Sequence, residues 1–275
     1  MDAGIERRLK IGAVSYLNTK PLVYGLAESA PWLEVVYDLP SRLADRLAAG
    51  ALDVALIPSI EFFQDPTYRI VSDACIGCRG AVLSVNLHSR VPMQRIRRLA
   101  LDEGSRTSVA LVRILLRERF GIEPELQSLP IGASAAECNA DAVLLIGDRA
   151  IAAPRSDFIE HWDLGDEWCR WAELPFVFAM WAARDGVELG DVEPALATAR
   201  DGGEAHLDEI AQREAGTLGL SREACLAYLR DNLYFHLGPR EREGLELFYR
   251  HAVQLELAPP GRELFTPLTA AAPNE

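Results

Sequence analysis

The stretch Ile11-Gly-Ala-Val-Ser-Tyr-Leu-Asn-Thr-Lys-Pro-Leu22 contains a joint between a strand and a helix. Residues Lys10 to Val14 form a short apolar run that predicts a strand. Asn18 or Thr19 occupies the place of a helix N-cap, with Pro21 in the first turn. A strand that ends in a capped helix presents free backbone N–H groups and the positive end of the helix dipole. The joint therefore suits an anionic ligand, although an ordinary capped joint is the alternative reading.

The chain repeats this joint three more times. Each repeat is an apolar run followed by small or polar residues and a helical pattern, and the three runs are Asp53–Ile57 before Pro58-Ser59, Ile96–Leu101 before Ser105, and Ala142–Ile146 before Gly147-Asp148. The joint at Ser105, Arg106, Thr107 and Ser108 has the richest anion-binding chemistry, because hydroxyl groups and an arginine surround one helix start. The candidates at the other joints are Ser15, Ser59, Gly147 and Asp148.

The remaining elements complete an alternation of strands and helices, which predicts an α/β fold with parallel sheets. Further strands are expected at 33–37, 70–71, 81–87, 125–129 and 174–182, a turn at 75–80, a turn with an aromatic residue at 163–168, and helices at 42–49, 109–121, 192–212, 221–228 and 239–256. In such sheets ligands bind beyond the carboxyl ends of the strands. Four joints in two halves of the chain predict two lobes that face each other across a cleft. The long strands around Ser84 and Val177 are the expected crossings, which makes one lobe from residues 1–85 plus 180–275 and the other from 86–179.

Composition limits the possible functions. The chain has 275 residues, 49% of them hydrophobic, and a formal net charge of -13. The negative charge argues against a nucleic-acid surface but leaves room for a small anionic ligand held by local donors. No run approaches the roughly 20 apolar residues of a membrane span. The first eight residues have no apolar core, so a secretory signal is not expected and a cytoplasmic location is.

The five cysteines do not form the pattern of a disulfide framework. Cys75 and Cys78 have the spacing of half a zinc site, but the other three are scattered and offer no second pair. We therefore expect no metal, and buried small residues beside a turn are the simpler reading.

Four motifs resemble those of the chorismate dehydratases of the futalosine route to menaquinone. They occur in the family's order and span most of the chain: Val14-Ser-Tyr-Leu-Asn-Thr-Lys-Pro-Leu22, Leu101-Asp-Glu-Gly-Ser-Arg-Thr-Ser-Val109, Leu145-Ile-Gly-Asp148 and Leu174-Pro-Phe-Val-Phe-Ala-Met-Trp181. The combination is specific, whereas each motif alone is weak. The resemblance implies a two-lobed fold similar to the type II periplasmic binding proteins, with the ligand between the lobes.

The resemblance also implies a dehydration without a cofactor. Chorismate would lose its ring 4-hydroxyl and its C3 proton, which gives the aromatic 3-[(1-carboxyvinyl)oxy]benzoate. This reaction needs groups that hold two carboxylates, a donor for the leaving hydroxyl and a base. Carried over from the family, Asn18 and Ser84 are the expected catalytic donors, and Arg106 with its hydroxyl neighbours is the expected carboxylate site. The alternative structural roles are an N-cap for Asn18, a strand serine bonded to backbone for Ser84, and a surface ion pair for Arg106.

The base is the open question. No histidine lies in the motifs, and Asp148 after Ile-Gly can also be a helix cap. This absence motivates the hypothesis that the substrate's own enolpyruvyl carboxylate removes the proton. Lys20 is a second candidate cation for the substrate, or an exposed lysine.

Three rival functions remain. The naphthoate-forming synthase of the same pathway shares the fold but is associated with a histidine in its cleft. A solute-binding protein would need export, and a ligand-sensing regulator would normally bring a basic DNA-binding module, which neither end of the chain resembles.

Overall fold

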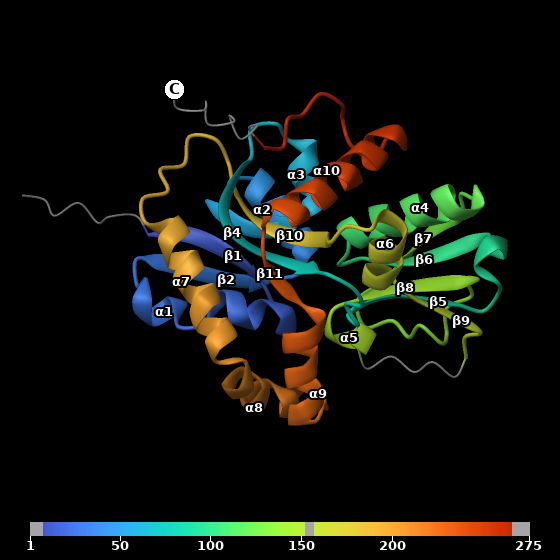
Figure 1. Cartoon of the computed structure of the whole chain (residues 1–275), viewed down its shortest axis with the longest axis horizontal. Helices are drawn as coiled ribbons and strands as arrows, with labels where there is room; N and C mark the ends of the chain where they lie inside the picture. The colour runs from blue at the N-terminus through green and yellow to red at the C-terminus, as the bar shows by residue number, and fades with distance from the viewer. Residues whose placement is uncertain (1–7, 152–156, 266–275) are drawn as a thin grey trace, which may run out of the picture.

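A computed structural model of the chain describes residues 8–151 and 157–265 and contains two β-sheets in two lobes, side by side in Figure 1. The larger sheet has the order β11-β4-β10-β3-β1-β2. Its strands are β1 (Leu9–Val14), β2 (Leu33–Asp38), β3 (Val54–Pro58), β4 (Arg69–Cys78), β10 (Phe176–Ala183) and β11 (Tyr234–His236). The smaller sheet has the order β7-β6-β8-β5-β9. Its strands are β5 (Val85–Ser89), β6 (Arg98–Asp102), β7 (Glu125–Leu129), β8 (Ala142–Ile146) and β9 (Glu160–Asp163). The division of the chain into 1–85 plus 180–275 and 86–179 stays a proposal, which this membership of the sheets supports.

Both sheets are mixed, whereas the sequence predicted parallel sheets. Strand β1 runs parallel to β2 and β3, and β6 runs parallel to β7 and β8. Strand β10 is antiparallel to both its neighbours, as is β5. The reason is topological, because each of these strands enters its sheet from the other lobe. It therefore starts at the edge where the parallel strands end.

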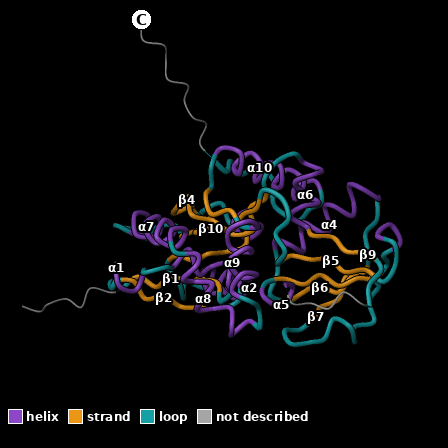
Figure 2. Tube along the Cα trace, turned by 60° about the horizontal axis from the view of Figure 1, so that its bottom comes forward, coloured by secondary structure: helices purple, strands orange, loops and turns teal. Residues whose placement is uncertain are grey.

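Helices cover the faces of the two sheets (Figure 1). They are η1 (Leu17–Val23), α1 (Leu26–Ser29), α2 (Pro40–Ala48), α3 (Ser59–Gln64), η2 (Met93–Arg95), α4 (Thr107–Phe120), α5 (Asp148–Ile151), α6 (Leu164–Ala172), α7 (Val192–Ala205), α8 (Leu207–Leu218), α9 (Arg222–Ala227), the π-helical turn η3 (Tyr228–Asn232) and α10 (Pro239–Gln254). Helix α10 packs on α3 of one lobe and α4 of the other, and it lies along the top of both lobes in Figure 2. No helix of the described residues has the length and apolar character needed to cross a bilayer.

Four sequence predictions about elements differ from the structure. Residues 75–80 were expected to turn, but the strand β4 continues to Cys78, and the expected strand at 81–87 begins only at Val85. Residues 163–168 form the end of β9 and the start of α6 rather than a turn, because the Asp163 carboxylate caps that helix. The expected helix at 192–212 is two helices, with the break at His206.

The buried interior explains why the central strands are continuous apolar runs. Every residue of β3, β8 and β10 is buried, as expected for strands covered on both faces. Trp168 and Trp181 are fully buried, and Trp168 Nε1 donates to the carbonyl of Pro175 at 3.2 Å. The core thus fixes the strand ends from which the site is built.

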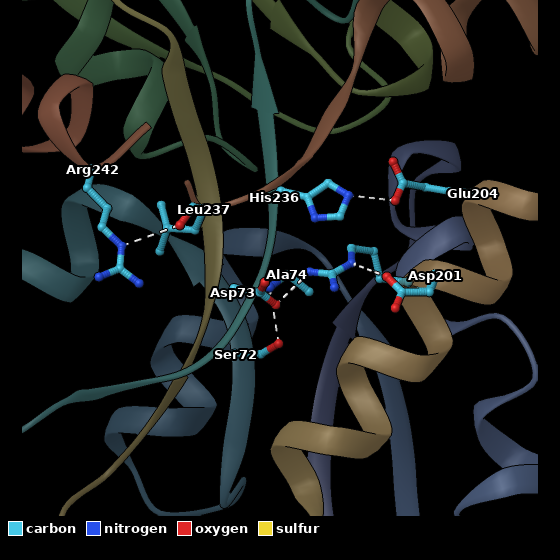
Figure 3. A network of polar contacts seen from close by, with 9 residues as sticks. Ser72, Asp73, Ala74, Asp201, Glu204, His236, Leu237 and Arg242 are labelled. Atoms are coloured by element: carbon cyan, nitrogen blue, oxygen red, sulfur yellow. Dashed lines mark hydrogen bonds and ion pairs between the residues drawn. The ribbon is translucent and has the colours of Figure 1, made fainter. Parts of the chain in front are cut away.

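A polar network attaches α7 to the outer strands of the larger sheet (Figure 3). Arg200, 5% exposed, donates to Asp73 on β4 at 2.6 Å and to Asp201 at 2.8 Å. His236 Nε2 on β11 lies 2.7 Å from Glu204 Oε2 on α7 (Figure 3). A nearly buried guanidinium with two carboxylate partners satisfies the requirement that buried charges be paired.

Candidate active site

A cavity lies between the two lobes. It is found at the carboxyl ends of β1, β3, β6 and β8 and the amino end of β5, where ligands bind in folds of this kind. Its lining consists of Val14, Tyr16, Asn18, Pro40, Pro58, Ile76, Val82, Ser84, Val85, Gly104, Ser105, Arg106, Thr107, Ser108, Ile146, Gly147, Phe178 and Ala179. All four strand–helix joints contribute to it. The apolar members form a wall suited to a hydrocarbon ring, and the polar members cluster at the joints.

Seven of the ten candidate residues line this cavity, namely Asn18, Ser84, Ser105, Arg106, Thr107, Ser108 and Gly147. The other three do not. Ser15 is exposed. The Ser59 hydroxyl donates to the carbonyl of Val177 at 2.5 Å, inside the core. The Asp148 carboxylate accepts from the backbone N–H of Leu17 at 3.1 Å.

Asn18 is not a helix cap, which corrects the sequence prediction. Helix η1 begins one residue earlier, at Leu17, and has no side-chain cap. The carboxylate of Asp148, from the other lobe, accepts the Leu17 N–H instead. The Asn18 carboxamide is therefore left to face the cavity, where Thr19 Oγ1 donates to its Oδ1 at 3.3 Å.

Ser84 is positioned by a strained turn. The residue before it, Leu83, has φ +57°, a conformation that costs a branched side chain free energy. Asp163 compensates this cost, since its Oδ2 accepts from Leu83 N at 2.6 Å and its Oδ1 from Val82 N at 3.0 Å. Asn86 Nδ2 donates to the Leu83 carbonyl at 2.6 Å. With both polar groups of Leu83 bonded, the turn presents Ser84, 1% exposed, to the cavity.

Helix α4 starts at the cavity wall. It begins at Thr107 without a side-chain cap, and Ser105, Thr107 and Ser108 are all buried there. An uncapped amino end of a 14-residue helix offers N–H groups and a positive dipole to an anion. The hydroxyl groups beside it add further donors.

Arg106 has two protein partners. Its Nη2 lies 2.7 Å from Asp45 Oδ1 and its Nη1 lies 3.0 Å from Glu61 Oε2, both carboxylates of the other lobe. The guanidinium therefore joins the lobes, and it still borders the cavity. Lys20, the second candidate cation, pairs with Glu214 at 3.2 Å and does not line the cavity.

Tyr16 closes the cleft by inserting between two glycines of the opposite lobe. A Cβ on Gly147 would lie 2.8 Å from the Tyr16 ring, and one on Gly104 would lie 3.2 Å from its hydroxyl oxygen. Gly147 also has φ +65°, which favours glycine. Together with Asp148–Leu17 and a 3.3 Å bond from Ile60 N to Thr107 Oγ1, this contact defines a closed arrangement of the lobes.

Burial keeps the phenol of Tyr16 protonated. Burial raises the pKa of Tyr16 well above its usual value, and the nearby carboxylate of Asp102 raises it further. Asp102 is fully buried and pairs with Arg149, whose Nε donates to it at 2.6 Å. Burial likewise raises the pKa of Asp148, against the hydrogen bond from Leu17 and the charge of Lys20. Asp148 is thus more easily protonated than a free carboxyl.

Sequence reasoning missed several functional residues. Tyr16 stands in the opening stretch and in the first motif, but it received no role of its own. Asp163 carried a recognisable signal, because acidic residues follow it in the first turn of α6 as in a capping motif.

Within the described residues, no three His, Cys, Asp or Glu side chains come together as ligands of a metal ion. Cys75 and Cys78 lie three apart on the extended strand β4, so their side chains leave opposite faces. Burial raises the pKa of Cys75 far above its usual value, which keeps the thiol inert.

The fold and the closed cavity define the class: a two-lobed α/β protein of the periplasmic-binding-protein type. Solved structures agree. Protein AF1704 from Archaeoglobus fulgidus matches with a TM-score of 0.69 at 16% identity, covering 92% of this chain and 99% of that one. The alkanesulfonate-binding protein SsuA from Xanthomonas axonopodis pv. citri, bound to MOPS, matches with a TM-score of 0.64 at 13% identity, covering 94% and 96%. At these identities the likeness shows the fold alone.

The family follows from sequence. The menaquinone biosynthesis family matches residues 9–254. The chorismate dehydratase of Thermus thermophilus is 32% identical over 267 residues, which is 90% of this chain and 96% of that protein. The chain belongs to the menaquinone biosynthesis family.

Proposed function

We propose that this protein dehydrates chorismate to 3-[(1-carboxyvinyl)oxy]benzoate in menaquinone biosynthesis, without a cofactor. The relative from Thermus thermophilus carries the name of this activity and aligns along almost its whole length. The observation that carries the proposal is the cavity itself, in which candidate residues from three of the joints meet Ser84 across a closed cleft.

Carboxylate binding is assigned to the amino end of α4. Ser105, Thr107 and Ser108 offer hydroxyl groups there, beside an uncapped helix start. The Arg106 guanidinium is already paired with two carboxylates, so its positive charge is partly neutralised. It therefore attracts a carboxylate of the substrate less strongly than its position implies. We assign it chiefly to holding the lobes around the bound molecule.

Asn18 and Ser84 are assigned to the reacting face of the ring. As the C4–O bond breaks, negative charge develops on the leaving oxygen, and donors aimed at that oxygen stabilise the transition state more than the ground state. The apolar residues Ile76 and Phe178 line the same cavity and exclude water from the ring. Formation of an aromatic ring supplies driving force, so fixed donors and orientation account for much of the catalysis.

The substrate's enolpyruvyl carboxylate is the proposed base. The carboxylate takes the C3 proton, the electron pair of the C3–H bond forms the new ring double bond as the C4–O bond breaks, and the leaving hydroxyl receives that proton and departs as water. No histidine occurs among the described lining residues, and Asp148 is engaged with Leu17 outside that lining. The lack of a lining histidine also argues against the naphthoate-forming synthase.

Incubation of the purified protein with chorismate alone tests the function. Appearance of the aromatic enol ether in the ultraviolet spectrum, without any added cofactor, is the expected result. Tight binding without turnover would instead favour a solute-binding protein. If the protein neither binds chorismate nor converts it, both functions are excluded.

Asp148→Asn is expected to leave the pH dependence of kcat unchanged, with kcat within about twofold of the wild type. The asparagine oxygen still accepts the Leu17 N–H. Because burial raises the folded pKa of Asp148, the wild type loses stability as pH rises from the ordinary aspartate value through that raised pKa. Asparagine does not ionise, so the free energy of unfolding of the variant near pH 7 should be no lower than that of the wild type. A kcat profile that loses an essential basic group in the variant would make Asp148 the base.

A further inference from the structure

Tyr16 reaches across the cleft from the larger lobe toward the amino end of α4. It follows β1, and its extended backbone (φ -87°, ψ 163°) directly precedes η1. Hydrogen bonds hold the chain on both sides of it. Ser15 N donates to the carbonyl of Asp38 at 3.1 Å, and Leu17 N donates to the carboxylate of Asp148 at 3.1 Å. The place of Tyr16 is therefore fixed by bonds to both lobes.

The phenol oxygen of Tyr16 lies beside the residues that lead into α4. A Cβ on Gly104 would lie 3.2 Å from this oxygen, and Gly104 directly precedes Ser105. Tyr16, Gly104 and Ser105 all line the cavity. The oxygen is thus close to the hydroxyl groups to which carboxylate binding is assigned.

This phenol carries an O–H that the protein itself does not engage. The hydroxyl of Tyr249 donates to the Pro259 carbonyl at 2.8 Å, whereas that of Tyr16 has no hydrogen-bond partner among the residues that the structure describes. Burial raises the pKa of Tyr16 well above its usual value, so the proton stays on the oxygen. A donor held away from bulk water gains free energy when it finds an acceptor, and an acceptor can reach this one from the cavity.

The charges near the phenol allow an anion to bind there. Asp102 is fully buried, but its Oδ2 accepts from Arg149 Nε at 2.6 Å and its Oδ1 accepts from Gly104 N at 3.0 Å. The negative charge of Asp102 is therefore balanced within the protein. Arg106 is likewise paired with carboxylates, so an anion at the start of α4 depends largely on neutral donors.

We propose that Tyr16 is a substrate-binding residue, whose phenol donates its O–H to the substrate carboxylate held at the amino end of α4. This inference rests on the proposed dehydration of chorismate. Ser105, Thr107 and Ser108 follow a strand of the smaller sheet, whereas Tyr16 follows a strand of the larger one. The carboxylate then has donors from both lobes. Hydrogen bonds to a charged acceptor are stronger than those between neutral groups, so one phenol oxygen has a measurable effect on affinity.

The carboxylate on the ring of chorismate is the one that this bond requires. Hydrogen bonds from protein donors lower the pKa of a carboxylate, so the enolpyruvyl carboxylate that is proposed to take the C3 proton must be free of strong donors. The ring carboxylate keeps its charge from substrate to product. A bond to it is equally strong in the ground state and the transition state, so its loss raises KM and leaves kcat unchanged.

Tyr16→Phe tests the inference, because it removes one oxygen and keeps the ring that packs against Gly104 and Gly147. We expect KM for chorismate to rise about tenfold, with kcat within about twofold of the wild type. The dissociation constant of the product, 3-[(1-carboxyvinyl)oxy]benzoate, should rise by the same factor, because the product keeps the ring carboxylate. Calorimetric titration measures this constant, and the melting temperature of the variant should stay close to that of the wild type.

2-Phenoxyacrylate distinguishes a bond to the ring carboxylate from a general effect on the cleft. This compound is the product without its ring carboxylate. Its dissociation constant should be the same for the wild type and for Tyr16→Phe. If the variant binds the analogue more weakly by the factor found for the product, Tyr16 acts on the cleft and the proposed bond is wrong.

Tyr249→Phe is the matched control. Tyr249 is also buried and its hydroxyl bonds to the Pro259 carbonyl and the Arg262 N–H, both at 2.8 Å and outside the cavity lining. This variant should keep the wild-type KM, kcat and affinity for the product. Unchanged KM in Tyr16→Phe, an equal rise in the control, or a loss confined to kcat would each overturn the role of Tyr16 alone. No turnover by the wild type would overturn the proposed function and this inference with it.

Discussion

Ser84→Ala is expected to lower kcat for chorismate about 10²-fold while KM changes little, because a donor that acts on developing charge is lost. The side chain is 1% exposed and lines the cavity at the amino end of β5. Its position is set by backbone bonds that alanine keeps, including the one from Gly147 N to the Ser84 carbonyl at 2.9 Å. The fold should therefore survive, and initial rates of aromatic product formation measure the effect.

Ser89→Ala controls for the loss of a buried hydroxyl close to Ser84 in the chain, at the far end of β5. Ser89 is fully buried on β5, and its hydroxyl donates to the carbonyl of Val91 at 2.6 Å, away from the cavity lining. This variant should lose stability without losing kcat. If Ser84→Ala retained full kcat, Ser84 would not be a catalytic donor, whatever the control shows.

The strand–helix joints were predictable because the residues that form each joint are consecutive in the sequence. The apolar runs that became β3 and β8 are buried on both faces, and small or polar residues follow directly where helices start. Parallel strands place their carboxyl ends at one edge, so four local patterns were enough to locate the cleft. Strands β5 and β10 are antiparallel to their neighbours, but both begin at that edge. The predicted position of the cleft is therefore unaffected.

The cap of η1 could not be predicted from its own sequence. Asn18 has the residue type of an N-cap, but the acceptor for this helix start is Asp148, 131 positions away. A local pattern indicates which residue is able to cap, whereas the folded protein selects among all acceptors in reach.

Leu83 shows a second limit. The alternation of polar and apolar residues around Ser84 favours a strand, yet the chain turns there with a positive φ at a leucine. Leucine carries no signal for this conformation, which is held by Asp163 and Asn86 from outside the turn. The strain at Leu83 and the bonds that hold it point to a functional constraint on the neighbouring serine.

Asp163→Ala is expected to lower both stability and kcat. The carboxylate accepts backbone N–H groups from the turn, at Val82 and Leu83, and from the first turn of α6, at Gly165 and Asp166. Their loss leaves four donors without this acceptor and should cost about 3 kcal/mol in the free energy of unfolding. Urea titration measures this loss, and kcat should fall because Ser84 is no longer held.

Asp163→Asn separates the two functions of this carboxylate. Oδ1 accepts from Val82, Gly165 and Asp166, whereas Oδ2 accepts from Leu83 alone. The asparagine oxygen should take the first position, because three donors meet there, and its NH₂ then faces the Leu83 N–H. The cap of α6 is kept and the bond to Leu83 is lost, so kcat should fall by about tenfold with a smaller loss of stability than in the alanine variant.

Two further variants decide whether this loss of activity comes from the strained turn. Asp141→Asn is the control, since Asp141 Oδ2 accepts from the backbone of Arg97 and Arg98 at 2.9 Å, outside the cavity lining. Its asparagine oxygen keeps both bonds, and the variant should leave kcat unchanged. Leu83→Gly should reduce the effect of Asp163→Asn on kcat, because glycine adopts a positive φ without the bond that leucine needs. If Asp163→Asn keeps wild-type kcat, or if glycine at position 83 brings no recovery, the bond to Leu83 does not position Ser84.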